Sequence, residues 1–116
     1  MDEQDYYQDS LISRDPRVGA FEPSRQYTVI VRRQATYLWG SAGIKQNVSY
    51  ATPLILHVHN DVKSASLTFG TETADGTKTV LGTLQPGETF SVTVQGIRGV
   101  YALTTAIEAV VRCIIK

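Results

Sequence analysis

Short runs in which apolar and polar residues alternate make up most of the chain after its N-terminal segment. Residues 64–69 (Ser-Ala-Ser-Leu-Thr-Phe) and 89–94 (Thr-Phe-Ser-Val-Thr-Val) alternate strictly. A two-residue period places successive side chains on opposite faces of a β-strand, so each run is expected to have one covered and one wet face. Turn signals such as Asp75-Gly76 and Pro86-Gly87 separate the runs. Roughly seven to nine short strands with almost no helix predict an all-β fold, an antiparallel β-sandwich or jelly-roll-like barrel.

The remaining elements are predicted from β-branched and aromatic residues and from the breaks between them. Residues 71–79 are expected to form a loop or hairpin tip, and only residues 105–109 have helical character. At 116 residues the chain has room for one domain. The expected strands are 27–35, 36–39, 44–50 as an edge strand, 54–59, 64–69, one at 80–81, 89–95, 100–104 and 109–115.

Residues 1–26 differ in kind from the rest and are predicted to form an extended N-terminal arm, with the β-sandwich domain spanning 27–116. The arm has six acids and three Arg, a formal charge of −3, whereas the body has a charge of +3. Because the segment is so polar, it cannot bury enough apolar surface to offset the entropy lost when it becomes ordered. It is therefore expected to need a partner surface. A helical turn folded onto the body, or plain disorder, are the alternatives. The expected partner-binding residues are Tyr6, Tyr7, Leu11, Ile12, Arg14, Arg17 and Phe21.

Composition excludes several classes of partner. The formal net charge is zero, so no bulk attraction to nucleic acid is expected. The acidic start lacks a secretory signal, and no apolar run approaches the roughly twenty residues that span a bilayer, so the chain is expected in a cytosol and away from membranes. Because Cys113 is the single cysteine, no internal disulfide can form, and the residue is expected to be small, hydrophobic and buried. An intermolecular bridge or a reactive thiol is the alternative.

His57 and His59 form the one pair of residues with metal-ligand spacing. Residues two apart on a strand share a face, so two imidazoles could chelate an ion. A cupin site adds a glutamate and another histidine, and this chain has only two histidines, so no metal is expected. A solvent-facing or interface pair is the alternative, and it would make assembly sensitive to mildly acidic pH.

No motif for catalysis or for a cofactor is present, so the chain is predicted not to be an enzyme. The five body acids fall mainly at turns, where solvated carboxylates are usual. Three aromatic residues flank the glycine-containing segment 40–43 and could stack on sugar rings, which would suit a carbohydrate-binding module or adhesin, although core packing is the commoner use. These residues are Tyr37, Trp39 and Tyr50.

The C-terminal third contains three segments in succession: Leu-Gln-Pro-Gly-Glu-Thr-Phe at 84–90, Gly-Ile-Arg-Gly-Val-Tyr-Ala at 96–102 and Val-Val-Arg-Cys-Ile at 110–114. This succession resembles small β-sandwich virion proteins of tailed bacteriophages. The resemblance implies a non-enzymatic capsid cement or decoration protein, or a neck or tail component. It also implies a homo-oligomer that binds other virion proteins, such as the major capsid protein, in a particle assembled in the host cytoplasm. The acidic arm would then lie over neighbouring subunits.

Overall fold

The computed structural model describes residues 25–116, which form eight strands in two antiparallel four-stranded sheets. This arrangement confirms the predicted all-β sandwich. The sequence pattern located most of these strands, because alternating residues select one buried face. The strands are β1 (Arg25–Val31), β2 (Thr36–Gly40), β3 (Leu54–Asn60), β4 (Leu67–Glu72), β5 (Lys78–Leu84), β6 (Thr89–Val94), β7 (Gly99–Leu103) and β8 (Ala109–Ile115).

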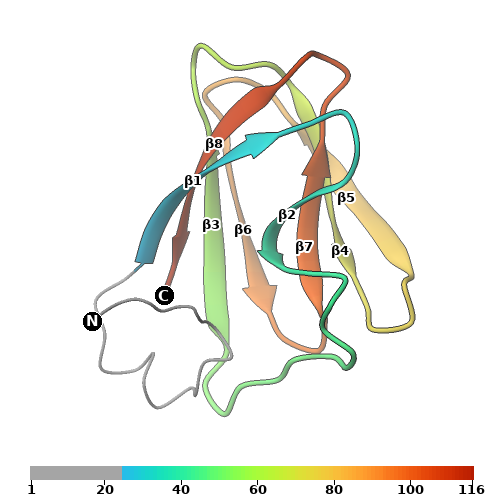
Figure 1. The fold of residues 1–116 in the computed structure, drawn as a ribbon. Helices are drawn as coiled ribbons and strands as arrows, with labels where there is room; N and C mark the ends of the chain where they lie inside the picture. The colour runs from blue at the N-terminus through green and yellow to red at the C-terminus, as the bar shows by residue number, and fades with distance from the viewer. Residues whose placement is uncertain (1–24) are drawn as a thin grey trace.

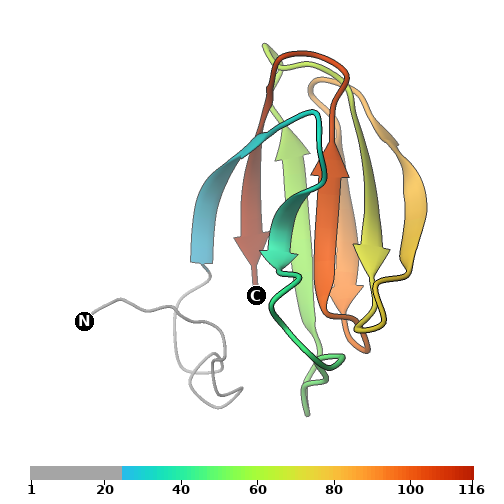
Figure 2. The same cartoon turned by 45° about the vertical axis from the view of Figure 1, so that its right-hand side comes forward.

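One sheet has the strand order β1-β8-β3-β6 and the other β2-β7-β4-β5, and the chain passes repeatedly from one sheet to the other (Figures 1 and 2). This is a jelly-roll type of connection, in which strands distant in sequence become neighbours. The first and last strands, for example, lie side by side, with Tyr27 opposite Cys113. Four strands have only one hydrogen-bonded neighbour in the described part of the chain: β1, β6, β2 and β5.

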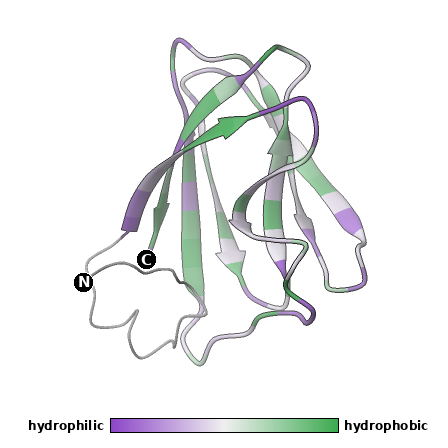
Figure 3. Ribbon diagram, viewed as in Figure 1, coloured by the Kyte–Doolittle hydropathy of each residue, from purple (hydrophilic) through white to green (hydrophobic). Residues whose placement is uncertain are grey.

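The core lies between the two sheets and is built from the inward residues of every strand. Along β3, Leu56 and Val58 are fully buried, whereas Ile55 is 40% exposed. Hydropathy itself alternates only at His57, Val58 and His59, since the first three residues of the strand are all hydrophobic (Figure 3). Each large apolar side chain so buried contributes about 1.5–3 kcal/mol. The fully or nearly buried cluster contains Val31, Leu38, Tyr50, Leu56, Val58, Leu67, Leu84, Val94, Val100, Ala102, Ala109, Val111 and Cys113.

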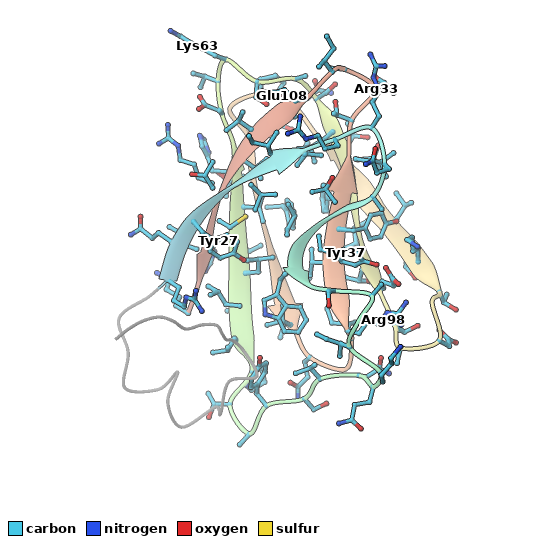
Figure 4. All side chains as sticks on the ribbon, viewed as in Figure 1. Tyr27, Arg33, Tyr37, Lys63, Arg98 and Glu108 are labelled. Atoms are coloured by element: carbon cyan, nitrogen blue, oxygen red, sulfur yellow. The ribbon has the colours of Figure 1, made fainter. Side chains whose placement is uncertain are left out.

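Tyr27 connects the two sheets through the core. Its ring points inward from β1, and its hydroxyl donates a hydrogen bond of 2.6 Å to the Leu38 carbonyl in β2 (Figure 4). A buried phenol needs such a partner, because an unpaired hydroxyl is costly away from water. Burial raises the pKa of Tyr27 far above its usual value, so the group stays neutral and acts as a donor.

Three local predictions were wrong. Residues 44–50 form no strand and contribute only the isolated bridge between Val48 and Ile97. Residues 105–109 are not helical, because residues 105–107 form a bend and Ala109 already pairs as the first residue of β8. The strand expected at 64–69 begins only at Leu67, as β4, because residues 61–64 form a turn in which the Ser64 N–H donates to the Asp61 carbonyl. The loop or hairpin tip expected at 71–79 is confirmed, since residues 73–77 form a turn between β4 and β5, held by Asp75, which accepts from the Thr77 N–H at 3.0 Å. In addition, β1 begins at Arg25, two residues before its expected start.

Candidate interaction site on the outer face of one sheet

The outer face of the β1-β8-β3-β6 sheet carries two cross-strand rows of mainly polar side chains. Antiparallel pairing places residues of neighbouring strands directly opposite each other on one face. The register of three strand pairs defines the members. One row contains Thr28, Arg112, His59 and Thr89, and the next contains Gln26, Ile114, His57 and Ser91.

His57 and His59 both lie on this face, as the alternation in β3 predicted. The Nδ1 atom of His57 is 2.7 Å from the Ser91 hydroxyl, and that of His59 is 2.9 Å from the Thr89 hydroxyl. Both rings are therefore oriented toward β6, side by side along the strand. Neither Nε2 atom has a hydrogen-bond partner among residues 25–116. These two nitrogens remain available to an external group.

All members of the two rows except Ser91 line an open depression of about 490 Å³, to which all four strands contribute. Arg112 gives the depression a permanent positive charge and lies directly opposite His59. The nearest acid is Asp61, whose carboxylate lies 3.5 Å from the Arg112 guanidinium. With one arginine, two titratable imidazoles and several hydroxyls, the depression is suited to anionic or strongly hydrogen-bonding groups.

Strand β6 borders this face and leaves one side of its backbone open. Asn60 donates its N–H to the Glu88 carbonyl, whereas Ile55 exchanges hydrogen bonds with Lys116 on the other side of β3. Because backbone groups of successive strand residues point to opposite sides, these bonds set the direction of every group in the β3–β6 pair. The N–H and C=O groups of three residues point away from β3, toward the open edge: Thr89, Ser91 and Thr93.

The four edge strands differ in their protection against pairing with another chain. Natural edges are commonly blocked by bulges, prolines or charged residues. Register shifts interrupt β2 and β5, and β5 also begins with Lys78. By contrast, β6 pairs without a shift and contains only Thr, Phe, Ser and Val. It is the edge best suited to accept a further strand.

The outer face of the other sheet is closed by a buried carboxylate. The prediction that this residue, Glu72, is a solvated turn acid was wrong, because it is 1% exposed. It accepts a hydrogen bond of 2.6 Å from the Tyr37 hydroxyl and two from the Arg98 guanidinium, with the Arg98 Nε at 3.0 Å. Lys78 lies 3.7 Å away, and Arg98 also donates to the Ala74 carbonyl. Figure 4 places Tyr37 and Arg98 together on this side.

These partners determine the ionisation of Glu72. Burial alone would raise the pKa of the carboxyl, but the bonds from Tyr37 and Arg98 and the charges of Lys78 and Arg98 outweigh burial and hold it below the usual 4.5. The ionised carboxylate of Glu72 in β4 thereby joins β2, through Tyr37, to the segment directly before β7, through Arg98. No signal in the sequence pairs Glu72 with Arg98, because the two residues are 26 positions apart.

The lowered pKa predicts a specific loss of stability in acid. A carboxyl with a depressed folded pKa contributes stability above its unfolded pKa and loses it as pH falls through the folded value. We therefore expect the free energy of unfolding to decline below pH 4.5. Urea unfolding across this range should show a weaker decline for Glu72→Gln. Equal pH dependence in the two proteins would contradict the assignment.

The three aromatic residues proposed for sugar stacking lie in different environments. Tyr50 is 8% exposed and belongs to the core. Tyr37 is bonded to Glu72, and Trp39 packs against the core cluster. A stacking platform needs exposed ring faces, so Tyr50 does not contribute to one in this structure. Glycan binding by this set stays a prediction.

The arm residues Tyr6, Tyr7, Leu11, Ile12, Arg14, Arg17 and Phe21 all lie outside the described residues. Their partner-binding role stays a prediction. Within residues 25–116, no group of three or more His, Cys, Asp or Glu side chains could hold a metal ion. In the same range, no helix is long and apolar enough to cross a membrane.

Cys113 is fully buried in the core, as its apolar neighbours predicted. Burial raises the pKa of its thiol to about 12, so the reactive thiolate is scarce at neutral pH.

Comparison with known proteins supports the fold. No family model and no curated protein matches the chain. Among solved structures, one similar chain comes from a study described as "Bacillus endospore appendages form a novel family of disulfide-linked pili". The match covers 80% of this chain and 81% of that chain, with 17% sequence identity and a TM-score of 0.52. That protein belongs to a bacterial appendage rather than to a bacteriophage particle, and the virion resemblance stays a prediction.

Proposed function

We propose that this chain is a non-enzymatic structural subunit that assembles with copies of itself into an extracellular appendage. The observation that carries the proposal is the unprotected edge of β6, whose outward backbone groups can pair with another chain. A second copy is the natural partner, since structural subunits act in many identical copies. The shared fold of a Bacillus pilus protein supports an appendage in particular.

Edge pairing offers a simple route to a long assembly. If β6 of one copy pairs with a different edge of the next, the contact is heterologous and repeats without closing, which builds a filament. Each junction adds backbone hydrogen bonds, and residues on alternate sides of the strand give specificity. The other regular edge is β1, which pairs with β8 without a register shift.

The junctions proposed for this chain are non-covalent. The neighbouring pili are described as disulfide-linked, whereas this chain has one cysteine and buries it. Reducing agents are therefore expected to leave its assemblies intact.

A virion decoration protein is the second candidate, favoured by the three C-terminal segments at 84–90, 96–102 and 110–114. Such a protein would bind a foreign lattice, including a major capsid protein, through the same kind of sandwich. The two candidates differ in the behaviour of the purified chain: an appendage subunit self-associates, whereas a decoration protein needs its lattice.

The test is Thr93→Pro in the full-length chain. Proline removes an outward N–H without breaking a bond to β3, and edge strands tolerate it. We expect the variant to remain folded while the concentration needed for self-association rises at least about tenfold. Sedimentation velocity over a concentration series, with and without reductant, measures this change.

Thr93→Ala is the matched control, because it removes the same side chain and keeps the N–H. It should associate like the parent protein. If Thr93→Pro and Thr93→Ala assemble equally, β6 is not the junction. If the parent chain stays monomeric at every concentration, the proposed self-assembly is wrong and the decoration candidate gains support.

A further inference from the structure

The charges of the chain are divided between its two parts. Residues 1–24 contain six acids and two Arg, a formal charge of −4, and residues 25–116 contain nine Lys plus Arg and five acids, a charge of +4. A body with this excess of positive charge attracts an acidic segment. The attraction is strongest where cationic groups gather with few acidic neighbours.

The depression on the β1-β8-β3-β6 sheet has the appropriate charges. His57 and His59 project Nε2 atoms that have no partner in the described chain, and Arg112 stands opposite His59. The facing residues of β6, Thr89 and Ser91, are uncharged.

The charged groups around the pair are few. Lys116, directly after β8, follows Arg112 and Ile114 with the same parity and is exposed. Two acids are near: Asp61 is paired with Arg112, and the Glu88 carboxylate accepts from the Gln85 N–H. Neither acid bonds to an imidazole, so both rings can receive an incoming carboxylate.

The spacing of the two histidines matches an extended acidic segment. Residues two apart on a strand are separated by about 6.6–6.8 Å. Glu3 and Asp5 have the same separation in sequence, so an extended segment parallel to β3 can present one carboxylate to each ring. Ile30, which is 43% exposed, and Ile55, which is 40% exposed, lie on the same face of the sheet. They offer apolar surface for the two tyrosines that follow Asp5 in the sequence.

We infer that this depression is the docking site for the acidic segment 1–24 of a second copy, and that His57 and His59 strengthen the docking as pH falls. The inference rests on the proposed self-assembly and adds a second contact between two copies, besides the pairing of β6. A second copy is the source because β1 begins at the end of the same sheet, with Arg25 opposite Ile115, so a segment of the same chain would have to reverse direction there. Pro23 opposes a helical reversal at that point.

The pH dependence follows from the two kinds of group. Imidazoles gain their charge near pH 6.5, whereas Asp and Glu stay ionised above about pH 4.5. Positive charge added to the depression on the histidines would strengthen its attraction to the acidic segment, and lowering the pH from about 8 to about 5.5 tests this effect. For two exposed charge pairs, about five- to tenfold tighter binding is expected, and added salt should reduce it.

The experiment measures binding of a labelled synthetic peptide with the sequence of residues 1–24 to the full-length chain by fluorescence anisotropy. Titrations are run at about pH 8, 6.5 and 5.5. The parent chain should bind about five- to tenfold more tightly at the lowest pH. The double variant His57→Gln/His59→Gln should show flat pH dependence, and Arg112→Gln should weaken binding at every pH. Circular dichroism verifies that both variants are folded.

A peptide with its six acids replaced by amides is the matched control and should bind weakly throughout. Absence of peptide binding, pH-independent binding, or equal binding of the amide peptide overturns the inference. Complete displacement by millimolar inorganic phosphate also overturns it, because the site would then be a general anion site. Sedimentation of the same samples separates the two proposals. If the chain self-associates but does not bind the peptide, this inference alone is wrong. If the chain binds the peptide but stays monomeric, the proposed self-assembly is wrong.

Discussion

Replacing Arg98 with methionine is expected to lower the free energy of unfolding by about 3–4 kcal/mol at neutral pH. The substitution removes both guanidinium bonds and the nearest positive charge from Glu72, whose side chain is 2% exposed. An ionised carboxylate left in that position has lost most of its compensation for desolvation. Urea unfolding measured at pH 7 gives the change directly.

Two further measurements separate this effect from lost packing. Lys78→Met removes a half-exposed cation 3.7 Å from the same carboxylate and should cost less than about 1 kcal/mol, because solvent screens an exposed pair. Adding Glu72→Gln to Arg98→Met should restore part of the stability by removing the orphaned charge. If the double variant is no more stable than Arg98→Met, the ion pair is not the source of the loss.

Changing Gly70 to alanine is expected to cost about 3 kcal/mol, the upper end for overpacking a tightly packed site. A Cβ at this position in β4 would lie 2.2 Å from the Thr79 carbonyl oxygen and 2.8 Å from the Tyr101 hydroxyl. The neighbouring atom is backbone from β5, near the register shift of the β4–β5 pair, so it cannot move as a flexible side chain would. Thermal unfolding of the variant measures the loss.

Gly82→Ala is the control for this prediction, since it lies on β5 in the same sheet. A Cβ there would meet only the Phe69 ring at 3.6 Å, which is ordinary van der Waals contact. Its unfolding temperature should stay close to that of the parent protein or rise slightly, because alanine restricts the unfolded chain. Similar losses at both glycines would indicate a general effect of the substitution rather than the close approach at Gly70.

The two outer faces of the sandwich have different roles in the functional proposals. On the β2-β7-β4-β5 sheet, the Glu72 carboxylate and its partners use their hydrogen bonds internally. On the β1-β8-β3-β6 sheet, the histidines and Arg112 keep unused bonding capacity beside an open strand edge. The proposed assembly therefore uses the outer face of one sheet, whereas the polar groups on the outer face of the other bond to one another.

The sequence by itself determined which residues face inward. Alternation at 89–94 and across His57, Val58 and His59 separates covered from exposed side chains because a strand has a period of two. The same rule was sufficient to place His57 and His59 on one face, and the apolar neighbours of Cys113 predicted its burial. These features depend on residues close together in the chain.

Only the tertiary structure decided which strands become neighbours and which side chains meet across them. Glu72 was expected at a solvated turn and instead is buried against Arg98, and of the two uses open to Tyr50, sugar stacking or core packing, the structure shows core packing. Residues 44–50 look strand-like but have only the bridge at Val48. Each outcome depends on contacts between distant segments, which local periodicity does not encode, because the free energy of pairing is realised only when the sheets close on one another.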